Sequence, residues 1–398
     1  MKILLVDDDP FALKLLSRLL ANQGFGDVVT HEHAVDALAL LEFGNHAFGL
    51  ILCDLQMPGM DGVEFIRQLV RIGYVGGLVL VSGEDSRILQ TVEKLSRAHR
   101  LNILGTLHKP VSPEQLQRVL ESHPSRATPR TERKIYEPEA LRQAIHGGRL
   151  INYYQPKVDL ASGAITGVET LVRWLHPEDG LVFPDQFIGT AEESGLIDDL
   201  TRTVLAGALR QAGAWEDAGL HLQVAVNVSM DNLGSLEFPD FVAQAVAQAG
   251  VPLDRLTLEV TESRLMKDPL AALDILTRLR LKHIGLSIDD FGTGHSSLAQ
   301  LRDIPFDELK VDRGFVHGAC CDPSIRAIFE ASLGMSQQLG MKTVAEGVEN
   351  QEDWEFLRTS GCDTAQGYFI ARPMPAEDLD CWIDVWGERR LALMRAKA

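Results

Sequence analysis

The sequence predicts two α/β domains in series: a doubly wound five-stranded parallel sheet, followed by a TIM-like (β/α)8 barrel. Three observations favour this fold class. A chain of 398 residues is too long for one ordinary domain. Short apolar runs alternate with amphipathic segments, as parallel strands alternate with helices in α/β proteins. The alternation stops once, at residues 122–138, so we expect domains at 1–121 and 139–392 with a linker between them.

The first domain is expected to contain a parallel sheet with helices on both faces. Its strand candidates consist almost entirely of apolar residues, as strands do when both faces of a sheet are covered. The first helix is expected to open after Asp9 and Pro10, which suit the cap and the first turn. The strand candidates are Ile3–Val6, Leu50–Cys53, Leu78–Val81 and Ile103–Leu107, and apolar residues at helical spacing cover 11–20 and 37–41.

The segment 122–138 has the composition of a solvated linker. It contains three prolines, several small polar residues and a cluster of basic side chains. Such residues disfavour regular structure and favour exposure to water. We prefer this interpretation to a nucleic-acid-binding patch.

After the linker, strands and helices alternate over about 250 residues, a usual length for a (β/α)8 barrel built on one core. The strand candidates are Ile165–Val168, Val224–Val226, Leu256–Val260, Ile284–Ile288, Leu309–Val311 and Thr343–Ala345. The helix candidates are Leu200–Trp215, Phe238–Ala249, Pro269–Leu281 and Ile325–Leu339.

Composition excludes several classes of function. A net charge of −18 would repel a nucleic acid, although carboxylates that gather divalent cations could still act on a small phosphate ester. Five cysteines without a C-x-x-C pair indicate reduced thiols instead of disulfides or a zinc site. No long apolar run predicts a membrane span. We therefore expect a cytoplasmic protein that binds neither DNA nor a membrane.

Polar residues end the apolar runs of the first domain: Asp7, Asp8, Asp54, Ser82 and Lys109. The carboxyl ends of parallel strands form the binding crevice of an open α/β sheet. Clustered carboxylates can hold Mg²⁺, one of them can attack a phosphoryl group, and an ammonium group can neutralise the developing charge.

This domain resembles the receiver domains of bacterial response regulators over essentially all of residues 1–121. The resemblance rests on V-D-D-D-P at 6–10, C-D-L-Q-M-P-G-M-D-G at 53–62, V-S-G at 81–83 and H-K-P at 108–110. It implies a sensor histidine kinase or phosphotransfer protein as partner. A receiver fold used only as a docking surface is the alternative.

By this resemblance Asp54 is the phosphoacceptor, and Asp7 and Asp8 help it to hold Mg²⁺. Ser82 takes the role of the switch hydroxyl, and Lys109 contacts the phosphoryl group. Many receivers have an aromatic residue three positions before this lysine, where Thr106 stands here. The departure affects the expected output mechanism and leaves the phosphorylation chemistry intact.

Carboxylates, an amide and a lysine also recur at the strand ends of the second domain. In a (β/α)8 barrel these ends converge on one face, where barrel enzymes have their active sites. Oxygen ligands suit Mg²⁺ or Mn²⁺ better than zinc, and the Asp289-Asp290 pair suggests two ions about 3.5–4 Å apart. The alternative is that each acid is solvated in its own loop. The residues are Glu169, Asn227, Glu259, Asp289, Asp290, Lys310 and Glu346.

The second domain resembles the EAL family of cyclic di-GMP phosphodiesterases across nearly all of residues 139–390. The motifs are Y-Q-P-K-V-D at 154–159, E-T-L-V-R-W at 169–174, N-V-S at 227–229, L-E-V-T-E-S at 258–263, D-D-F-G-T-G-H-S-S-L at 289–298, F-D-E-L-K-V-D at 306–312, A-E-G-V-E at 345–349 and Q-G-Y-F-I-A-R-P at 366–373.

The resemblance implies a role for each matching residue. Glu169, Asn227, Glu259 and Asp289 would hold one ion, and Asp289, Asp290 and Glu346 a second. Lys310 would lie beside the hydrolytic water, and Glu346 would act as ligand or as general base. Glu262 would anchor the loop 291–297. The implied substrate contacts are Gln155, Leu171, Arg173, Asp307 and Gln366.

Two residues depart from the family pattern without removing a ligand. Thr170 replaces a small apolar residue, and His295 stands where tyrosine is frequent. His295 could bind a metal, but a lone loop histidine more often packs or forms hydrogen bonds.

The expected function is hydrolysis of cyclic di-GMP to linear pGpG, catalysed with Mg²⁺ or Mn²⁺ and regulated by receiver phosphorylation. The resemblance also implies a homodimer or a larger homo-oligomer. Two alternatives are a non-catalytic cyclic di-GMP receptor and a barrel hydrolase that acts on another phosphodiester.

Overall fold

The computed structural model divides into two compact units, Met1–Glu132 and Arg133–Ala398, each with its own sheet. The structure describes residues 1–43, 48–83, 89, 91–93, 95–96, 101–121, 134, 136–229, 231–261, 269–292, 301 and 303–395. Within these residues, no helix is long and apolar enough to cross a membrane.

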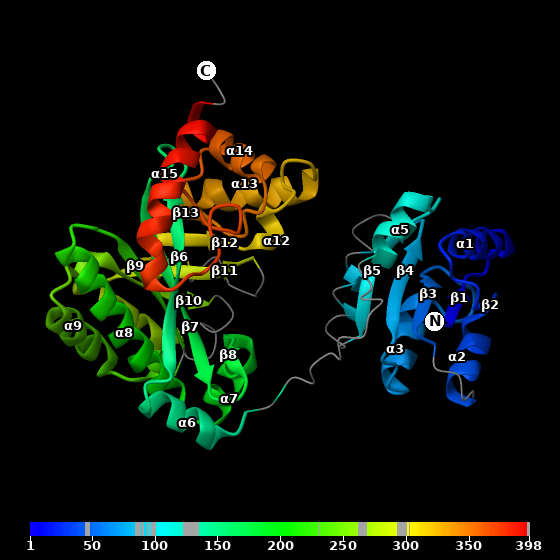
Figure 1. The fold of residues 1–398 in the computed structure, drawn as a ribbon, viewed down its shortest axis with the longest axis horizontal. Helices are drawn as coiled ribbons and strands as arrows, with labels where there is room; N and C mark the ends of the chain where they lie inside the picture. Colours follow the sequence, from blue (N-terminus) through cyan, green and yellow to red (C-terminus); the bar gives the residue numbers. More distant parts are fainter. Residues whose placement is uncertain are drawn as a thin grey trace. The chain divides into compact units, whose positions relative to one another are not determined.

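The first unit is a five-stranded parallel sheet in the order β2-β1-β3-β4-β5 (Figure 1). Apolar clusters cover its two faces, because alternate residues of a strand point in opposite directions. Leu4 belongs to one cluster with Phe65, and Leu5 to the other with Leu16 and Leu116. The predicted doubly wound sheet is confirmed. Its elements are β1 (Ile3–Val6), α1 (Pro10–Asn22), β2 (Val28–His31), α2 (Ala34–Phe43), β3 (Leu50–Asp54), α3 (Gly62–Arg71), β4 (Gly77–Ser82), β5 (Asn102–His108) and α5 (Pro113–Glu121).

The start of α1 follows the expected capping pattern. Pro10 is the first helical residue, where its missing N–H removes no helical hydrogen bond. The Asp9 side chain accepts a hydrogen bond from Phe11 N at 2.8 Å. This cap ends the segment after β1 and places Asp7 and Asp8 at the carboxyl edge of the sheet.

The second unit is a closed barrel in the order β6-β14-β13-β12-β11-β10-β9-β7, with β8 added outside β7 and with β6 paired to β7. The predicted TIM-like barrel is confirmed. Its strands are β6 (Leu150–Asp159), β7 (Ile165–His176), β8 (Gly180–Val182), β9 (Gln223–Val228), β10 (Leu256–Thr261), β11 (Gly285–Phe291), β12 (Glu308–Val311), β13 (Lys342–Ala345) and β14 (Thr364–Ala365).

The first barrel strand, β6, runs against the seven other strands that close the barrel. β6 is antiparallel to β7 and to β14, whereas the remaining neighbours around the barrel are parallel. The connection of β6 to β7 explains this, since residues 160–164 are too few for the crossover that parallel strands need. Gly163 takes a φ of 68°, and its N–H donates to Asp159 O at 2.7 Å, which closes the turn.

Helices enclose the barrel and bury the outward-facing residues of its strands. Val224 and Val226 of β9 belong to one apolar core with Leu205 and Leu209 of the long helix α8. Alternate residues point into the barrel, where several are polar and buried, including Lys157, Glu259 and Lys310. The helices are α6 (Pro138–His146), α7 (Ile188–Glu193), α8 (Ile197–Asp217), α9 (Phe238–Ala249), α10 (Pro269–Leu281), α12 (Arg313–Val316), α13 (Pro323–Gln338), α14 (Gln351–Ser360) and α15 (Leu379–Arg395).

The loops after β13 and β14 pack backbone against backbone. Val348 N donates to Gln366 O at 3.1 Å, and Phe369 N donates to Val348 O at 2.9 Å. Gly367 lies between these bonds, and a Cβ atom added to it would collide with the backbone N and O of Val348. The missing side chain of Gly367 therefore allows the two loops to approach.

We expect Gly367→Ala to lower the free energy of unfolding by about 1–3 kcal/mol, because the backbone of Val348 cannot yield without breaking its hydrogen bonds. Urea unfolding would measure the change. Gly334→Ala is the matched control, since Gly334 lies in α13 with open space around it and should gain about 0.5–1 kcal/mol. Equal stabilities of the two variants would contradict the prediction.

Candidate functional site

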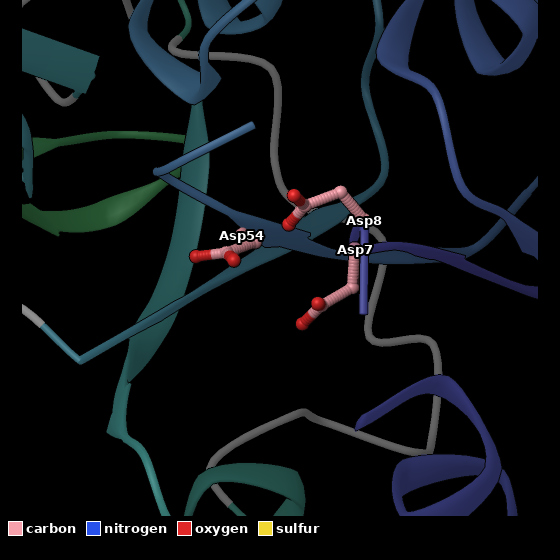
Figure 2. Close-up of side chains that lie close together, drawn as sticks. All are labelled: Asp7, Asp8 and Asp54. Carbon is pink, nitrogen blue, oxygen red and sulfur yellow. The ribbon is translucent and has the colours of Figure 1, made fainter. Parts of the chain in front are cut away.

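Three aspartates meet at the carboxyl edge of the first unit's sheet. Asp7 and Asp8 follow β1, and Asp54 is the last residue of the neighbouring β3. One carboxylate oxygen from each lies within 4.8 Å of the others (Figure 2). Asp7 and Asp54 are buried, whereas Asp8 is exposed. This set of oxygens fits the ligand preference of Mg²⁺.

Lys109, directly after β5, joins two of these aspartates. Its Nζ lies 2.7 Å from Asp54 Oδ2 and 2.7 Å from Asp7 Oδ2. Burial raises the pKa of Asp7 by more than the hydrogen bond from Lys109 lowers it. Burial by itself would lower the pKa of Lys109, but the two carboxylates raise it above its ordinary value. A charged ammonium group therefore lies directly beside the predicted phosphoacceptor.

The two remaining receiver candidates lie on the neighbouring strands. Ser82 ends β4, and its backbone oxygen accepts a hydrogen bond from Lys109 N at 2.8 Å. Thr106 is half-buried in β5 and pairs with Leu80 across the strands. Ser82 is thus at the same edge of the sheet as the three aspartates.

Lys310 is the centre of the second site, at the carboxyl end of the barrel. It lies on β12 and is 1% exposed. Its ammonium group contacts four carboxylates that come from four other parts of the barrel. The distances from Nζ are 2.7 Å to Glu346 Oε1, 2.9 Å to Glu259 Oε2, 2.9 Å to Asp289 Oδ1 and 3.5 Å to Glu169 Oε2.

Two amide side chains donate hydrogen bonds to the carboxylate of Glu169. Asn227 Nδ2 donates to Glu169 Oε1 at 3.0 Å, and Gln366 Nε2 donates to Glu169 Oε2 at 2.6 Å. Gln366 Nε2 also donates to Gln155 Oε1 at 3.1 Å, and Gln155 faces Glu169 in the β6–β7 pairing. Both glutamines predicted as substrate contacts therefore adjoin the predicted ligand Glu169.

Asp289, Asp290 and Glu346 form the second acidic group of the site. One ligand oxygen from each lies within 4.8 Å of the others. Asp290 has a φ of 55°, so the chain turns sharply after Asp289 and both aspartates lie at the barrel mouth. Carboxylates at this spacing, together with Asn227 and Glu169, are a donor set that fits Mg²⁺ or Mn²⁺.

The electrostatics of this cluster are unbalanced. Five carboxylates contact the ammonium groups of Lys157 and Lys310, and Asp290 adds a sixth negative charge close by. Burial and the nearby carboxylates raise the pKa of Glu346 to about 8, although Lys310 opposes the shift. Burial would also raise the pKa of Glu259, but the two lysines outweigh it and lower this pKa to about 2. The carboxylates in this balance are Glu169, Glu259, Asp289, Asp290, Glu308 and Glu346.

A cavity of about 330 Å³ opens onto the acidic residues. Gln155, Leu171 and Gln366 line it together with Tyr368. A mostly apolar cavity of about 240 Å³ adjoins it, and Leu171 lines both. Arg173 lies further along β7, where its guanidinium group is 5.4 Å from the Tyr153 ring and 5.0 Å from the Phe183 ring.

The structure places Asp307 away from these residues. It precedes β12 at the amino end of the barrel, whereas the acidic cluster is at the carboxyl end. Its Oδ2 accepts from Leu286 N at 2.9 Å and its Oδ1 lies 2.6 Å from Arg280. The structure therefore does not support Asp307 as a substrate contact. Residues 307 and 310 lie at different depths because β12 runs along the barrel from its amino end to its carboxyl end. Glu262 and His295 lie outside the described residues.

Sequence reasoning assigned no role to two residues near this cluster. Asp312 is two residues beyond Lys310 and close enough to Asp290 to raise its pKa, after the larger effects of burial and Asp289. Lys157 is buried beside Glu259. Spacing along the chain could have indicated both residues. Side chains two positions apart in a strand share a face, and Lys157 and Asp312 are each two residues from a predicted site residue.

Comparisons with known proteins match both units. The EAL domain model matches residues 138–373, and the response regulator receiver domain model matches residues 3–121. The cyclic di-GMP phosphodiesterase RocR of Pseudomonas aeruginosa is 33% identical over 382 residues, which cover 95% of this chain and 97% of RocR.

One further relative and one solved structure each match about three fifths of this chain. The bifunctional diguanylate cyclase/cyclic di-GMP phosphodiesterase MucR of Pseudomonas aeruginosa is 44% identical over 240 residues, covering 60% of this chain and 35% of MucR. A solved structure described as PaMucR phosphodiesterase in complex with c-di-GMP is 43% identical, with a TM-score of 0.58. It covers 61% of this chain and 98% of that structure's chain.

Fold and site together define a class of protein in which a receiver-type domain precedes a barrel enzyme with a carboxylate-lined mouth. The EAL domain model covers more than half of the chain, and RocR aligns with nearly all of it. The chain belongs to the EAL domain family and carries a response regulator receiver domain before the EAL domain. Both resemblances found in the sequence are confirmed.

The raised pKa of Glu346 predicts that the metal-free protein loses stability as the pH rises. Between the unfolded-state pKa of about 4.3 and the folded value of about 8, the folded state binds the extra proton, so stability falls with pH. Glu346→Gln removes this titration, and Lys310 retains its other carboxylate partners. We expect the melting temperature in EDTA to fall less between pH 5 and about pH 8 than it does in wild type.

Each kcal/mol that the variant retains should appear as about 2–4 °C in the melting temperature. Glu352→Gln, on the exposed start of α14, is the matched control and should follow the wild-type pH dependence. Parallel curves for Glu346→Gln and wild type would show that Glu346 does not titrate in this range.

Proposed function

We propose that this chain hydrolyses one phosphodiester bond of cyclic di-GMP and releases linear pGpG. The observation that carries the proposal is the convergence of Lys310 and four carboxylates at one barrel mouth. Two relatives support the choice of substrate. RocR, named a cyclic di-GMP phosphodiesterase, aligns along nearly the whole chain, and the PaMucR structure is a c-di-GMP complex.

The donor set suggests which residues hold each of two divalent cations. Glu169, Asn227, Glu259 and Asp289 would hold one, and Asp289, Asp290 and Glu346 the other. When bound, such cations activate a water nucleophile and offset negative charge on the phosphate. The close spacing of the oxygens of Asp289, Asp290 and Glu346 supports this assignment.

Lys310 would orient the attacking water and Glu346 would either bind a cation or accept the proton of that water. The ammonium group of Lys310 is held by carboxylates on several sides, which restricts its position. Glu346 Oε1 lies 2.7 Å from Lys310 Nζ, so this carboxylate lies beside the lysine that would orient the water. A proton acceptor with a raised pKa suits general-base chemistry near neutral pH.

Gln155, Leu171, Gln366 and Arg173 are the proposed substrate contacts. The first three line the cavity beside the acidic cluster. Arg173 offers the planar donor pair that binds a phosphate through two hydrogen bonds, and the Tyr153 and Phe183 rings limit its movement.

For the receiver, we propose that Asp54 accepts a phosphoryl group from a histidine kinase or a phosphotransfer protein, with Mg²⁺ held by Asp7, Asp8 and Asp54. The support is the acidic cluster, in which Lys109 contacts Asp7 and Asp54. Phosphorylation would regulate the hydrolase, and a homodimer or larger homo-oligomer is proposed from family membership.

We expect the purified chain to convert cyclic di-GMP to pGpG with Mg²⁺ or Mn²⁺ and to stop when EDTA is added. Loss of an outer partner of a metal ligand commonly lowers activity by about 10- to 100-fold. Because Glu169 is itself a proposed ligand, Glu169→Ala should lower kcat by more than this. Product analysis by chromatography measures both effects. The control is Glu330→Ala on the exposed face of α13.

If the chain binds cyclic di-GMP but forms no product, it is a non-catalytic receptor. If it cleaves another phosphodiester faster than cyclic di-GMP in a competition assay, that phosphodiester is its substrate. Full turnover by Glu169→Ala would contradict the site assignment itself.

We expect a small phosphodonor such as acetyl phosphate to change the rate of hydrolysis, because the phosphoryl group adds charge beside Lys109 and Asp7. Asp54→Asn is the control, as it keeps the size of the side chain and removes the acceptor. This variant should neither incorporate phosphoryl nor respond to the donor. An unchanged wild-type rate despite stoichiometric phosphorylation would refute regulation through Asp54.

A further inference from the structure

Lys157 is a buried lysine inside the barrel that the proposed reaction does not use. It lies on β6 and is 5% exposed. Gln155, two residues earlier on the same strand, faces Glu169 of the site. Because β6 runs opposite to the other strands, the chain descends into the barrel after Gln155, and Lys157 lies one layer below the mouth.

The ammonium group of Lys157 connects two carboxylates from two other strands. Its Nζ donates to Glu259 Oε1 at 2.7 Å and to Glu308 Oε1 at 3.0 Å. Ser287 Oγ donates to the same Glu308 oxygen at 2.9 Å. Residues on β10 and β12 therefore fix the position of the Lys157 ammonium group.

Glu259 is consequently held by one lysine on each carboxylate oxygen. Oε1 accepts from Lys157, and Oε2 accepts from Lys310 at 2.9 Å. The terminal torsion of a glutamate is broad, so a carboxylate held at one oxygen only could rotate. The contact with Lys157 removes this freedom and keeps Oε2 directed towards Lys310 and the acidic cluster.

Stability alone does not account for a lysine at this depth. Buried ion pairs are often no more stabilising than apolar residues of similar volume, because removing charges from water is costly. An outer partner that orients a metal ligand, by contrast, commonly determines how tightly the metal binds.

We propose that Lys157 is a positioning residue, which fixes the carboxylate of Glu259 and thereby sets the affinity of the barrel for its divalent cation. The inference rests on the proposed function, in which Glu259 is a cation ligand. Lys157 itself contacts neither the substrate cavity nor the reacting atoms. The ligand concerned is a hard divalent cation, and the probe is Mn²⁺.

The test is calorimetric titration of Mn²⁺ into the full-length chain carrying Asp8→Asn and Asp54→Asn, which remove the receiver's acidic cluster. Lys157→Met, of similar length and without charge, should weaken Mn²⁺ binding by about 10- to 100-fold. In hydrolysis assays kcat should fall at limiting Mn²⁺, whereas KM for cyclic di-GMP at saturating Mn²⁺ should not change. Mn²⁺ binding as tight as in the parent chain would overturn the proposal.

Two further variants separate positioning from charge balance and from folding. Lys157→Met/Glu308→Gln removes one positive and one negative charge together, so the net charge of the barrel interior stays the same. This double variant replaces the single variant if Lys157→Met does not fold. The Mn²⁺ defect should persist in this double variant, because Glu259 still lacks its donor. Normal affinity would mean that Lys157 only balances charge.

Ser336→Ala is the matched control for loss of a buried hydrogen bond. Ser336 Oγ donates to Met341 O at 3.0 Å, in α13 and outside the barrel interior. This variant should bind Mn²⁺ as the parent does. An equal loss of Mn²⁺ affinity in Ser336→Ala and Lys157→Met would assign the effect to destabilisation and refute positioning. If the parent chain binds Mn²⁺ but does not cleave cyclic di-GMP, the proposed function fails and the Mn²⁺ titration still decides the role of Lys157.

Discussion

The barrel depends on how the ammonium group of Lys310 is accommodated inside it. A lysine that is 1% exposed must find carboxylate partners, because burial of an unpaired charge is prohibitively costly. Four partners reach it from β7, β10, β11 and the loop after β13. The contacts that stabilise the buried ammonium group also bring the four carboxylates close together. Their mutual repulsion is then only partly offset, and a divalent cation would complete the balance.

The reversed strand β6 gives the barrel interior an unusual composition. Barrels of this general architecture are usually filled by layers of branched apolar side chains. Here Gln155 and Lys157 enter from a strand whose direction is opposite to that of its neighbours, at two successive depths. Lys157 meets Glu259 and Glu308 where apolar packing would be expected. Buried polar residues therefore lie directly beneath the carboxylates at the barrel mouth. Ion pairs as well as strand geometry fix the positions of these carboxylates.

The sequence predicted the architecture well because its strand candidates are short and rich in leucine, isoleucine and valine. Leu256–Val260 alternates apolar residues with Thr257 and Glu259, and this period of two favours a strand over a helix. Asp307 was misplaced because a motif gives order along the chain and not position along the barrel axis; residue 307 precedes β12 and Lys310 lies near its end. Pairs such as Lys157 and Glu259, 102 residues apart, depend on barrel closure, which local pattern cannot specify.

The two sites use lysine differently, and this bears on how each could respond to a signal. The side chain of Lys109 is 28% exposed and contacts two aspartates, whereas that of Lys310 is 1% exposed and contacts four carboxylates. A phosphoryl group on Asp54 would add a strong acceptor that Lys109 can reach by moving its side chain alone, since its backbone N–H is held by Ser82 O. With Thr106 in the place of an aromatic switch, a shift of the Lys109 side chain away from Asp7 is the change in this unit that follows most directly from the added charge.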